Sequence, residues 1–232
     1  MDVNNNELPL LPVPIVLFPG TFMPLSVETD SFREMLYDFF DSRQKFGAVY
    51  SSHDYSLGHK AVPALIGCVA TVELIVNKDG SDSYYAVLEG HQRIRVLNVI
   101  EGEPLSTAII EYLPDHSGND AVSKANRAME LFRQYLGLIR DRYQLDNMDL
   151  VSPHDPNLTS YLLASILMMP QEVKQRCLES ATAAYRLEEE LGYLEKEVEN
   201  LEMLHNISKI TKKDFSFPDN EYFVNLMRIS EN

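Results

Sequence analysis

The sequence predicts an α+β protein in which a β-rich half with one inserted helix, residues 1–115, precedes a helical half, residues 116–232. Short runs rich in β-branched and aromatic residues, separated by glycines, occupy the end of the first half. After position 120 the apolar residues recur every three or four positions, as in amphipathic helices. Between the halves, residues 114–120 (PDHSGND) form a polar, turn-rich link, where we place the domain boundary.

The first elements follow from prolines and helical spacing. Residues 8–20 are expected to run extended, because each proline pushes the residue before it toward β or polyproline conformations, and Pro19-Gly20 should form a tight turn. Residues 31–42 place five apolar side chains at helical spacing behind Asp30 or Ser31 as N-cap, which predicts a helix. Residues 46–50 read as a further strand.

The remaining β-rich runs predict an antiparallel meander. Its strands are expected at 69–76, 84–88, 93–100 and 105–112, with a hairpin connection around Asp79-Gly80. Because side chains alternate along a strand, Arg93 and Arg95 should share a wet face opposite Ile94 and Val96.

The second half predicts a helical bundle. Helical spacing covers residues 125–139 and 157–169, and a long helix is expected over about 171–205, followed by a short tail in which 222–228 forms a closing helix or strand. Leucines and a valine form an apolar seam of two heptads in the long helix. This length favours packing within the bundle over a coiled-coil homodimer, which stays open as an alternative.

Charge and cysteine content limit the class of protein. There are 35 acidic and 20 basic residues, a net charge of −15, which argues against a protein built to neutralise nucleic-acid phosphates. The N-terminus lacks a basic region and is interrupted by prolines, so neither a secretory signal nor a membrane span is expected. Cys68 and Cys177 are expected to be buried thiols, which fits a reducing, cytoplasmic setting.

Motifs for catalysis or metal binding are missing from the sequence. There is no Gly-Lys dipeptide and hence no P-loop, and neither Gly-x-Ser-x-Gly nor His-Glu-x-x-His occurs. The six histidines do not show metal-ligand spacing, and the loop with His53, Asp54 and His59 is interpreted as solvated rather than as a zinc site. We therefore predict no catalytic residue, no cofactor and no metal.

Four phrases of the first half carry a resemblance to a known family. They are LPLLPVPIVLFPG at 8–20, MPLSV at 23–27, GCVA at 67–70 and VLEGHQRIRV at 87–96. In this order and spacing they resemble the N-terminal substrate-binding domain of Lon proteases, and residues 162–179 and 184–194 resemble its helical segment. The resemblance covers residues 7 to about 205. The ATPase and Ser/Lys peptidase modules of Lon are absent, so the chain is most similar to stand-alone bacterial Lon-domain proteins.

The resemblance implies both a fold and a function. The β-rich half should be a bent antiparallel sheet folded toward a PUA-like pseudo-barrel, followed by the helical bundle. The implied function is non-enzymatic binding of unfolded or damaged polypeptide segments through exposed apolar side chains, with a protease or chaperone as a further partner. The candidate binding residues are Phe18, Phe22 and Met23 beside the Pro19-Gly20 turn, together with Met168 and Met169; core packing is the alternative for each.

Two other functions are weaker alternatives. PUA-like folds elsewhere bind RNA, and Arg93 with Arg95 would supply a local basic patch. The net charge of −9 over residues 1–115 and −6 over residues 116–232 opposes that function. A hydrolase is the least favoured, because the motifs of the ATPase and peptidase modules are absent.

Overall fold

A computed structural model describes residues 6–27, 29–51, 64–77, 84–143 and 153–211. The chain separates into two compact units. Residues 1–115 and 169–181 form the first, here called the β unit, and residues 116–168 and 182–232 form the second, here called the helical unit. The change of unit after residue 115 lies where the turn-rich link was expected, but the β unit also takes up residues 169–181 from the second half.

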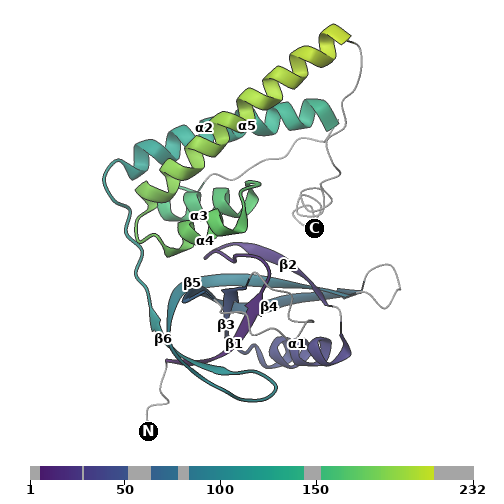
Figure 1. Cartoon of the computed structure of the whole chain (residues 1–232), viewed down its shortest axis with the longest axis vertical. Helices are drawn as coiled ribbons and strands as arrows, with labels where there is room; N and C mark the ends of the chain where they lie inside the picture. Colours follow the sequence, from purple (N-terminus) through teal and green to yellow (C-terminus); the bar gives the residue numbers. More distant parts are fainter. Residues whose placement is uncertain (1–5, 28, 52–63, 78–83, 144–152, 212–232) are drawn as a thin grey trace. The chain divides into compact units, whose positions relative to one another are not determined.

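The described part of the β unit holds six strands and two helices (Figure 1). In chain order they are β1 (Glu7–Val13), β2 (Phe22–Val27), α1 (Asp30–Ser42), β3 (Phe46–Tyr50), β4 (Ile66–Asn77), β5 (Tyr84–Ile100), β6 (Thr107–Tyr112) and α4 (Gln171–Glu179). The two runs predicted at 84–88 and 93–100 are a single strand, β5, because Gly90 continues the strand instead of breaking it.

Five strands close into a ring. The sheet order is β2-β5-β4-β3-β1-β6, and an additional pairing joins β5 to β6. This confirms the predicted pseudo-barrel. The sheet is mixed rather than antiparallel, however, because β1 and β3 pair in parallel. A helix lies in the connection between them, and such a crossover brings two strands together in the same direction. β2 pairs with β5 alone and lies at the end of the sheet.

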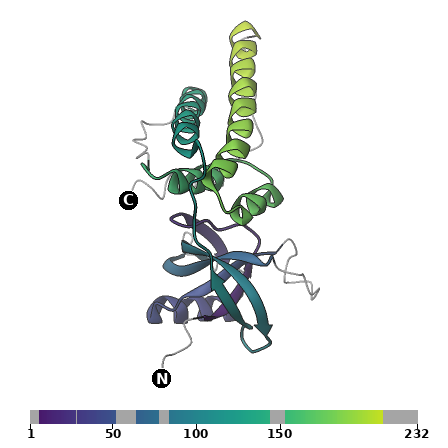
Figure 2. The ribbon, with the colours of Figure 1, turned by 90° about the vertical axis from the view of Figure 1, so that its left-hand side faces the viewer.

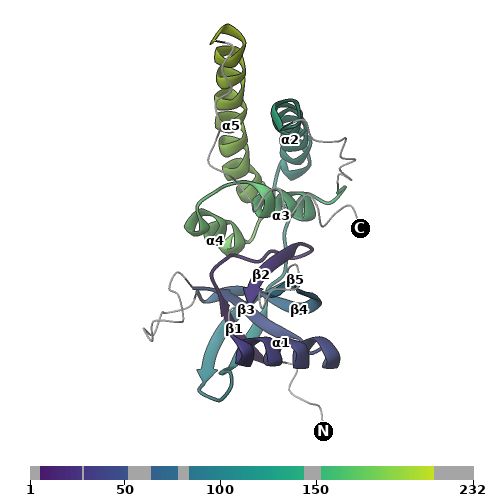
Figure 3. The same cartoon turned by 90° about the vertical axis from the view of Figure 1, so that its right-hand side faces the viewer.

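The buried side chains of the β unit form two clusters. The larger packs α1 against the sheet, and Leu36, Phe39 and Phe46 are among its members, the rings of Phe39 and Phe46 stacking at 5.1 Å. The smaller cluster lies on the other side of the sheet, around Val49 and Ile94. Figure 3 shows α1 lying along the sheet. Strands that close a ring carry apolar side chains on both faces, and α1 covers one of these faces.

The N-cap of helix α1 lies one residue before Asp30 and two before Ser31, the two predicted caps. Thr29 is the N-cap, and its Oγ1 accepts a hydrogen bond from the backbone N–H of Phe32 at 3.3 Å. Both Asp30 and Ser31 lie inside the helix. Asp30 is placed in the first turn, where a carboxylate is favoured by the helix dipole.

The predicted long helix over 171–205 is wrong at its start. The chain forms α4 and then a separate helix, α5 (Ala183–Thr211), with Ser180 extended between them (φ −68°, ψ 130°). Helix α4 belongs to the β unit, where Gln171 Oε1 accepts a hydrogen bond from Val16 N at 3.0 Å and Gln175 Nε2 donates to the Ile66 carbonyl at 3.0 Å. Helical periodicity continues across the break, so the pattern alone did not show it.

The helical unit contains α2 (Ala121–Tyr143), α3 (Pro156–Ile166) and α5. Figures 1 and 3 show α2 and α5 running alongside each other. The apolar seam of α5 is buried inside this unit, which confirms packing within the bundle; its residues are Leu187, Leu191, Leu194, Val198 and Leu201. Helix α3 begins at Pro156 and is capped by Asp155, whose side chain accepts a hydrogen bond from Asn157 N at 2.9 Å.

Some predictions lie outside the described residues: the Asp79-Gly80 hairpin turn, the loop with His53 and His59, and the segment 222–228. In the parts of the chain that are described, no helix is both long and apolar enough to cross a bilayer. Cys68 and Cys177 are both buried, as predicted.

Candidate functional site

One face of the section formed by β2, β5 and β4 carries apolar side chains that solvent reaches. Antiparallel pairing sets three residues side by side in each of three rows, which are Phe22–Glu89–Thr71, Pro24–Val87–Leu74 and Ser26–Tyr85–Val76. Phe22 is 53% exposed, Leu74 47% and Val76 42%. We call these nine residues the outer face. At about 4.8 Å between strands and 6.8 Å between alternate residues, it spans roughly 10 by 14 Å, enough for about four residues of an extended chain.

A β-bulge creates this apolar surface. Val72 pairs with Leu88 on the buried side, and the next paired residue of β4 is Leu74, opposite Val87, so Glu73 is the extra residue. Strict alternation would turn Glu73 outward and both Leu74 and Val76 into the core. The bulge reverses this side-chain order for the rest of the strand, because a shift of one residue moves every side chain to the other face.

The free edge of β2 is a poor template for strand addition. The Thr21 carbonyl accepts a hydrogen bond from Gly90 N at 2.9 Å, so the alternate residues Phe22, Pro24 and Ser26 direct their backbone groups away from β5. Pro24 has no N–H to donate, and proline is one of the devices that protect sheet edges. A ligand of this region would therefore contact the outer face rather than extend the sheet beyond β2.

Polar groups border one end of the outer face. The Thr71 hydroxyl donates to Glu73 Oε1 at 2.8 Å, and His91 Nε2 lies 2.7 Å from the same hydroxyl oxygen. Since the hydroxyl proton is directed at the carboxylate, His91 is not placed to remove it, and the group is exposed. The arrangement suits a hydrogen-bonded rim and does not form a nucleophile with its base.

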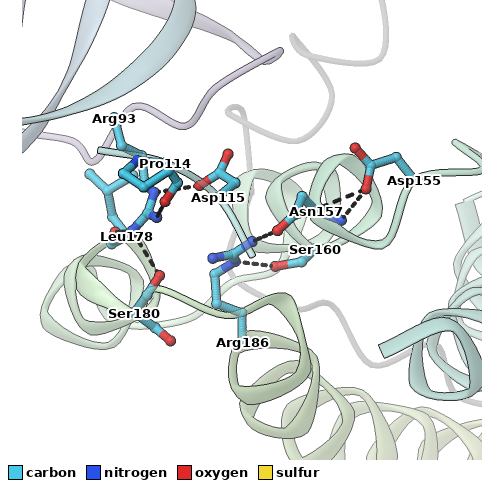
Figure 4. Close-up of polar contacts among 9 residues, drawn as sticks. All are labelled: Arg93, Pro114, Asp115, Asp155, Asn157, Ser160, Leu178, Ser180 and Arg186. Carbon is cyan, nitrogen blue, oxygen red and sulfur yellow. Dashed lines mark hydrogen bonds and ion pairs between the residues drawn. The ribbon is translucent and has the colours of Figure 1, made fainter. Parts of the chain in front are cut away.

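Arg93 ties strand β5 to the end of α4. Its side chain is 1% exposed, and Figure 4 shows its hydrogen bonds. Nε donates to Asp115 Oδ1 at 2.7 Å, and Nη2 donates to the Pro114 carbonyl at 2.8 Å. Nη1 donates to the carbonyls of Leu178 at 3.0 Å and Ser180 at 2.8 Å. The predicted wet face of the strand is thus wrong at this position. A guanidinium presents five donors in a fixed fork, so it can satisfy carbonyl groups that a helix end leaves without partners.

Two glycines near Arg93, Gly90 and Gly67, lie where another backbone segment comes very close. An added Cβ at Gly90 would lie 2.2 Å from the Phe18 carbonyl oxygen, and one at Gly67 would lie 2.3 Å from that of Ala48. Both glycines are required by close approach of another backbone segment. The Phe18 segment and α4 are in this way held close to β5, and β4 lies close to β3 at Gly67.

Comparison with known protein families identifies the chain. The model of the ATP-dependent protease La (LON) substrate-binding domain matches residues 7–196. The chain belongs to this family.

Lon relatives and solved Lon domains agree with that match. The chain is 28% identical over 222 residues to the Lon protease of Anaeromyxobacter dehalogenans and 25% identical over 226 residues to that of Nitrosococcus oceani. These matches cover 94% and 95% of this chain but only 26% and 29% of the two proteases. The chain therefore spans about a quarter of the length of these relatives, in the region of the substrate-binding domain.

Two solved structures share the fold. They are the crystal structure of a Lon N-terminal domain protein from Xanthomonas campestris and the N-terminal domain of the Mycobacterium avium complex Lon protease. The first has a TM-score of 0.55 at 19% identity and covers 81% of this chain; the second has a TM-score of 0.59 at 14% identity and covers 82%. In both cases 98% of the other chain is matched.

Of the five predicted binding residues of this Lon domain, three are buried in the structure and two are exposed. Phe18, Met23 and Met169 are buried, at 0%, 2% and 4% exposure, so they offer no surface to a ligand in this structure. Met23 faces the core because it alternates with Phe22 along β2. Phe22 and Met168 are exposed, at 53% and 63%. Phe22 belongs to the outer face of the β unit, while Met168 belongs to the helical unit.

Sequence reasoning missed Leu74 and Val76. The apolar run 69–76 was interpreted as a strand of the meander, and nothing marked its second half as exposed. The signal was weak: Glu73 lies between apolar neighbours, where a bulge absorbs it without burying a carboxylate.

The basic patch on which RNA binding would depend is not present. Arg93 is buried against carbonyl groups, and Arg95 pairs with Glu111 at 2.8 Å on an exposed part of β5 and β6. Neither arginine side chain is therefore available by itself to bind a phosphate group.

Groups suited to catalysis are also not assembled in the described residues. Among them, no cluster of three or more His, Cys, Asp or Glu side chains could hold a metal ion. Burial raises the pKa of the Cys68 thiol to about 12, so it stays protonated at neutral pH and is a poor nucleophile.

The helical unit buries a network of charged and polar side chains. Arg186 Nε donates to Ser160 Oγ at 2.8 Å, its Nη2 donates to Asn157 Oδ1 at 2.8 Å, and its guanidinium lies 4.2 Å from the centre of the Tyr161 ring. The Ser160 hydroxyl donates to Glu190 Oε1 at 3.0 Å (the arginine contacts are drawn in Figure 4). Burial raises the pKa of Glu190 well above its usual value, and Glu190 Oε2 has no hydrogen-bond partner within the described residues.

Proposed function

We propose that this Lon substrate-binding domain binds exposed apolar segments of unfolded or damaged polypeptides on the outer face of the β unit. The observation that carries the proposal is the set of exposed apolar side chains on one face of this section, Phe22 on β2 with Leu74 and Val76 on β4; between them lies β5, where Val87 is buried. Contiguous apolar surface with a polar border is typical of protein interaction sites.

The position of this surface supports binding over a purely structural role. Leu74 and Val76 are exposed only because a bulge turns them outward, whereas a regular strand would bury them. Bulges are commonly used to redirect side chains near functional sites. Exposure of these side chains costs hydrophobic stabilisation of roughly 25 cal/mol per Å² left in water, and a bound apolar segment would recover part of that cost.

The proposed role is binding without catalysis, with delivery to a protease or chaperone as its use. The family match supports a substrate-binding domain, and the polar groups near the outer face are arranged as a rim. In this proposal the purified chain leaves casein intact with and without ATP.

Fluorescence anisotropy with a labelled twelve-residue peptide of alternating Leu and Ser tests the proposal. We expect saturable binding in the range of tens of micromolar, and about tenfold weaker binding by Leu74→Ser, because one central apolar contact is lost. A peptide of alternating Gly and Ser should not bind.

Val122→Ser is the matched control, since Val122 is also an exposed aliphatic residue, at 63%, but lies in α2. Its affinity should equal that of the unmodified chain. No saturable binding of the Leu-Ser peptide, or equal loss in both variants, would contradict the proposal.

A further inference from the structure

Further exposed apolar side chains lie along the part of β5 that extends past the first residue of its partner strand β4. Leu65 is 66% exposed, Leu97 59%, Ile100 47% and Val99 42%. The Leu65 carbonyl accepts a hydrogen bond from Val96 N at 2.8 Å, which places Leu65 beside the start of this section of β5. We call Leu97 and Ile100 the hairpin surface, because both lie on the β5–β6 hairpin, whose end projects from the ring in Figure 2. Val99 pairs with Ala108 and Leu65 stands beside Val96, so these two lie on the opposite face, which carries the smaller core cluster.

The backbone of β5 is open along this surface. Strand β4 begins at Ile66, which pairs with Arg95, so residues 98–100 pair with β6 on one side and with no described strand on the other; Leu97 is the extra residue of a bulge between Val96 and Asn98. Val99 stands opposite Ala108. Ile110 N donates a hydrogen bond to Asn6 O, away from β5. Because backbone groups alternate along a strand, the N–H and carbonyl of Ala108 also point away from β5. Its partner Val99 must then direct its own N–H and carbonyl to the open side of β5.

This edge differs from that of β2. In β2, Pro24 lacks a backbone N–H donor, whereas residues 97–100 of β5 are Leu-Asn-Val-Ile and retain every backbone N–H. An unprotected edge with exposed aliphatic side chains is the arrangement to which an extended peptide adds as a strand.

The charges around the surface select the kind of peptide. Residues 95–112 hold one arginine, three glutamates and no lysine, and the arginine is already paired with Glu111. Glu101 and Glu103 lie in the exposed connection between β5 and β6. The whole β unit carries 18 acidic and 9 basic residues, and two of the basic ones, Arg93 and Lys174, are buried. A second copy of this acidic surface would be repelled, whereas a basic segment would be attracted.

We propose that the hairpin surface binds extended polypeptide segments in which aliphatic residues alternate with lysine or arginine, by strand addition to residues 97–100 of β5. The aliphatic side chains contact Leu97 and Ile100, and the cations lie near Glu101 and Glu103. The proposal needs none of the outer-face residues, so the two surfaces can be tested separately.

The test uses the full chain and labelled twelve-residue peptides in fluorescence anisotropy. A peptide of alternating Val and Lys should bind at least tenfold more tightly than one of alternating Val and Glu or of alternating Ser and Lys. Leu97→Ser and Glu103→Gln, both at exposed positions, should each weaken the Val-Lys complex severalfold, and Leu74→Ser on the outer face should not.

Amide hydrogen exchange reports on the binding mode. Addition of the Val-Lys peptide should slow exchange of the Val99 amide, and the same peptide should leave the Phe22 amide on the edge of β2 unchanged. Equal affinity for the Val-Lys and Val-Glu peptides, or an unchanged Val99 exchange rate at saturation, would overturn this proposal. Either result leaves the outer-face proposal standing, because that one is judged by the Leu-Ser peptide and Leu74→Ser.

Discussion

The β unit and the helical unit both expose apolar side chains, but they distribute them differently. In the helical unit these side chains are spread over α2, α3, α5 and the segment after α3; they are Val122, Leu158, Met168, Tyr185 and Met203. The β unit leaves aliphatic side chains in water at two places on β4 and β5, and uses its buried Arg93 to satisfy carbonyls at the end of α4. The helical unit buries its apolar seam completely and encloses Arg186 and Glu190 among its helices. Exposed apolar surface serves binding, while a buried polar network serves to specify one packing arrangement. We therefore propose the β unit, rather than the helical unit, as the place of recognition.

Loss of Arg93 should have the largest effect. Arg93→Ala removes the donors to three carbonyls and to Asp115, which leaves buried acceptors without partners, so the free energy of unfolding should fall by about 3–5 kcal/mol. Urea unfolding followed by circular dichroism measures the change.

Arg95→Ala is the matched control, two residues along the same strand. The Arg95–Glu111 pair is about half exposed on both sides, so its loss should cost below about 1 kcal/mol. If the two variants were equally stable, Arg93 would not be the tie that holds α4 to the β unit.

Glu190→Gln should alter the pH dependence of the helical unit. Burial raises the pKa of Glu190 in the folded chain, so the folded protein keeps its proton at pH values where the unfolded chain has released it. Its contribution to stability is therefore most favourable below the unfolded pKa, near 4.5, and declines as the pH rises through the raised folded pKa. The Gln variant lacks this decline, so its gain over the unmodified chain should grow from pH 5 to pH 9 in thermal unfolding.

Glu188→Gln is the control on the same helix. Glu188 is exposed, and its hydrogen bond and charge attraction to Lys124 lower its pKa. A lowered folded pKa contributes stability above the unfolded pKa that is lost on acidification, so the sign is opposite and the effect is weak. Parallel pH profiles for the two variants would show that Glu190 is not held in an apolar setting.

Prediction from sequence succeeded where a local pattern decides the structure. Strand β3 was predicted with its observed ends, and the seam of α5 was predicted to pack inside the bundle. Both follow from alternation or helical spacing that holds over the whole element. The resemblance in residues 8–20 and 87–96 identified the family.

Prediction failed where a tertiary contact overrides the pattern. Arg93 reads as a surface residue because its partners at 114–115 and 178–180 are distant in sequence. The break between α4 and α5 is invisible to periodicity, since both helices are amphipathic. The outer face depends on one bulge at Glu73, and a single inserted residue reverses which side chains are exposed. Burial of Met23 has a related origin, because residue type does not reveal which side of β2 faces the core around α1. Phe18 lies before β2, in a segment whose backbone comes close to Gly90 of β5.

The smallest expected effect concerns glycines, and it separates the two units most cleanly. An added Cβ at Gly192 in α5 would meet no atom within 4 Å, so Gly192→Ala should raise the free energy of unfolding by up to about 1 kcal/mol through helix propensity. Gly137→Ala in α2 should behave alike, because its surroundings are equally open. Gly67→Ala in β4 should instead destabilise by about 1–3 kcal/mol, since the new Cβ would clash with the Ala48 carbonyl. Urea unfolding of the three variants measures the contrast. Destabilisation by Gly192→Ala would contradict the open surroundings of this glycine, which lines a groove together with Lys124 and Arg127.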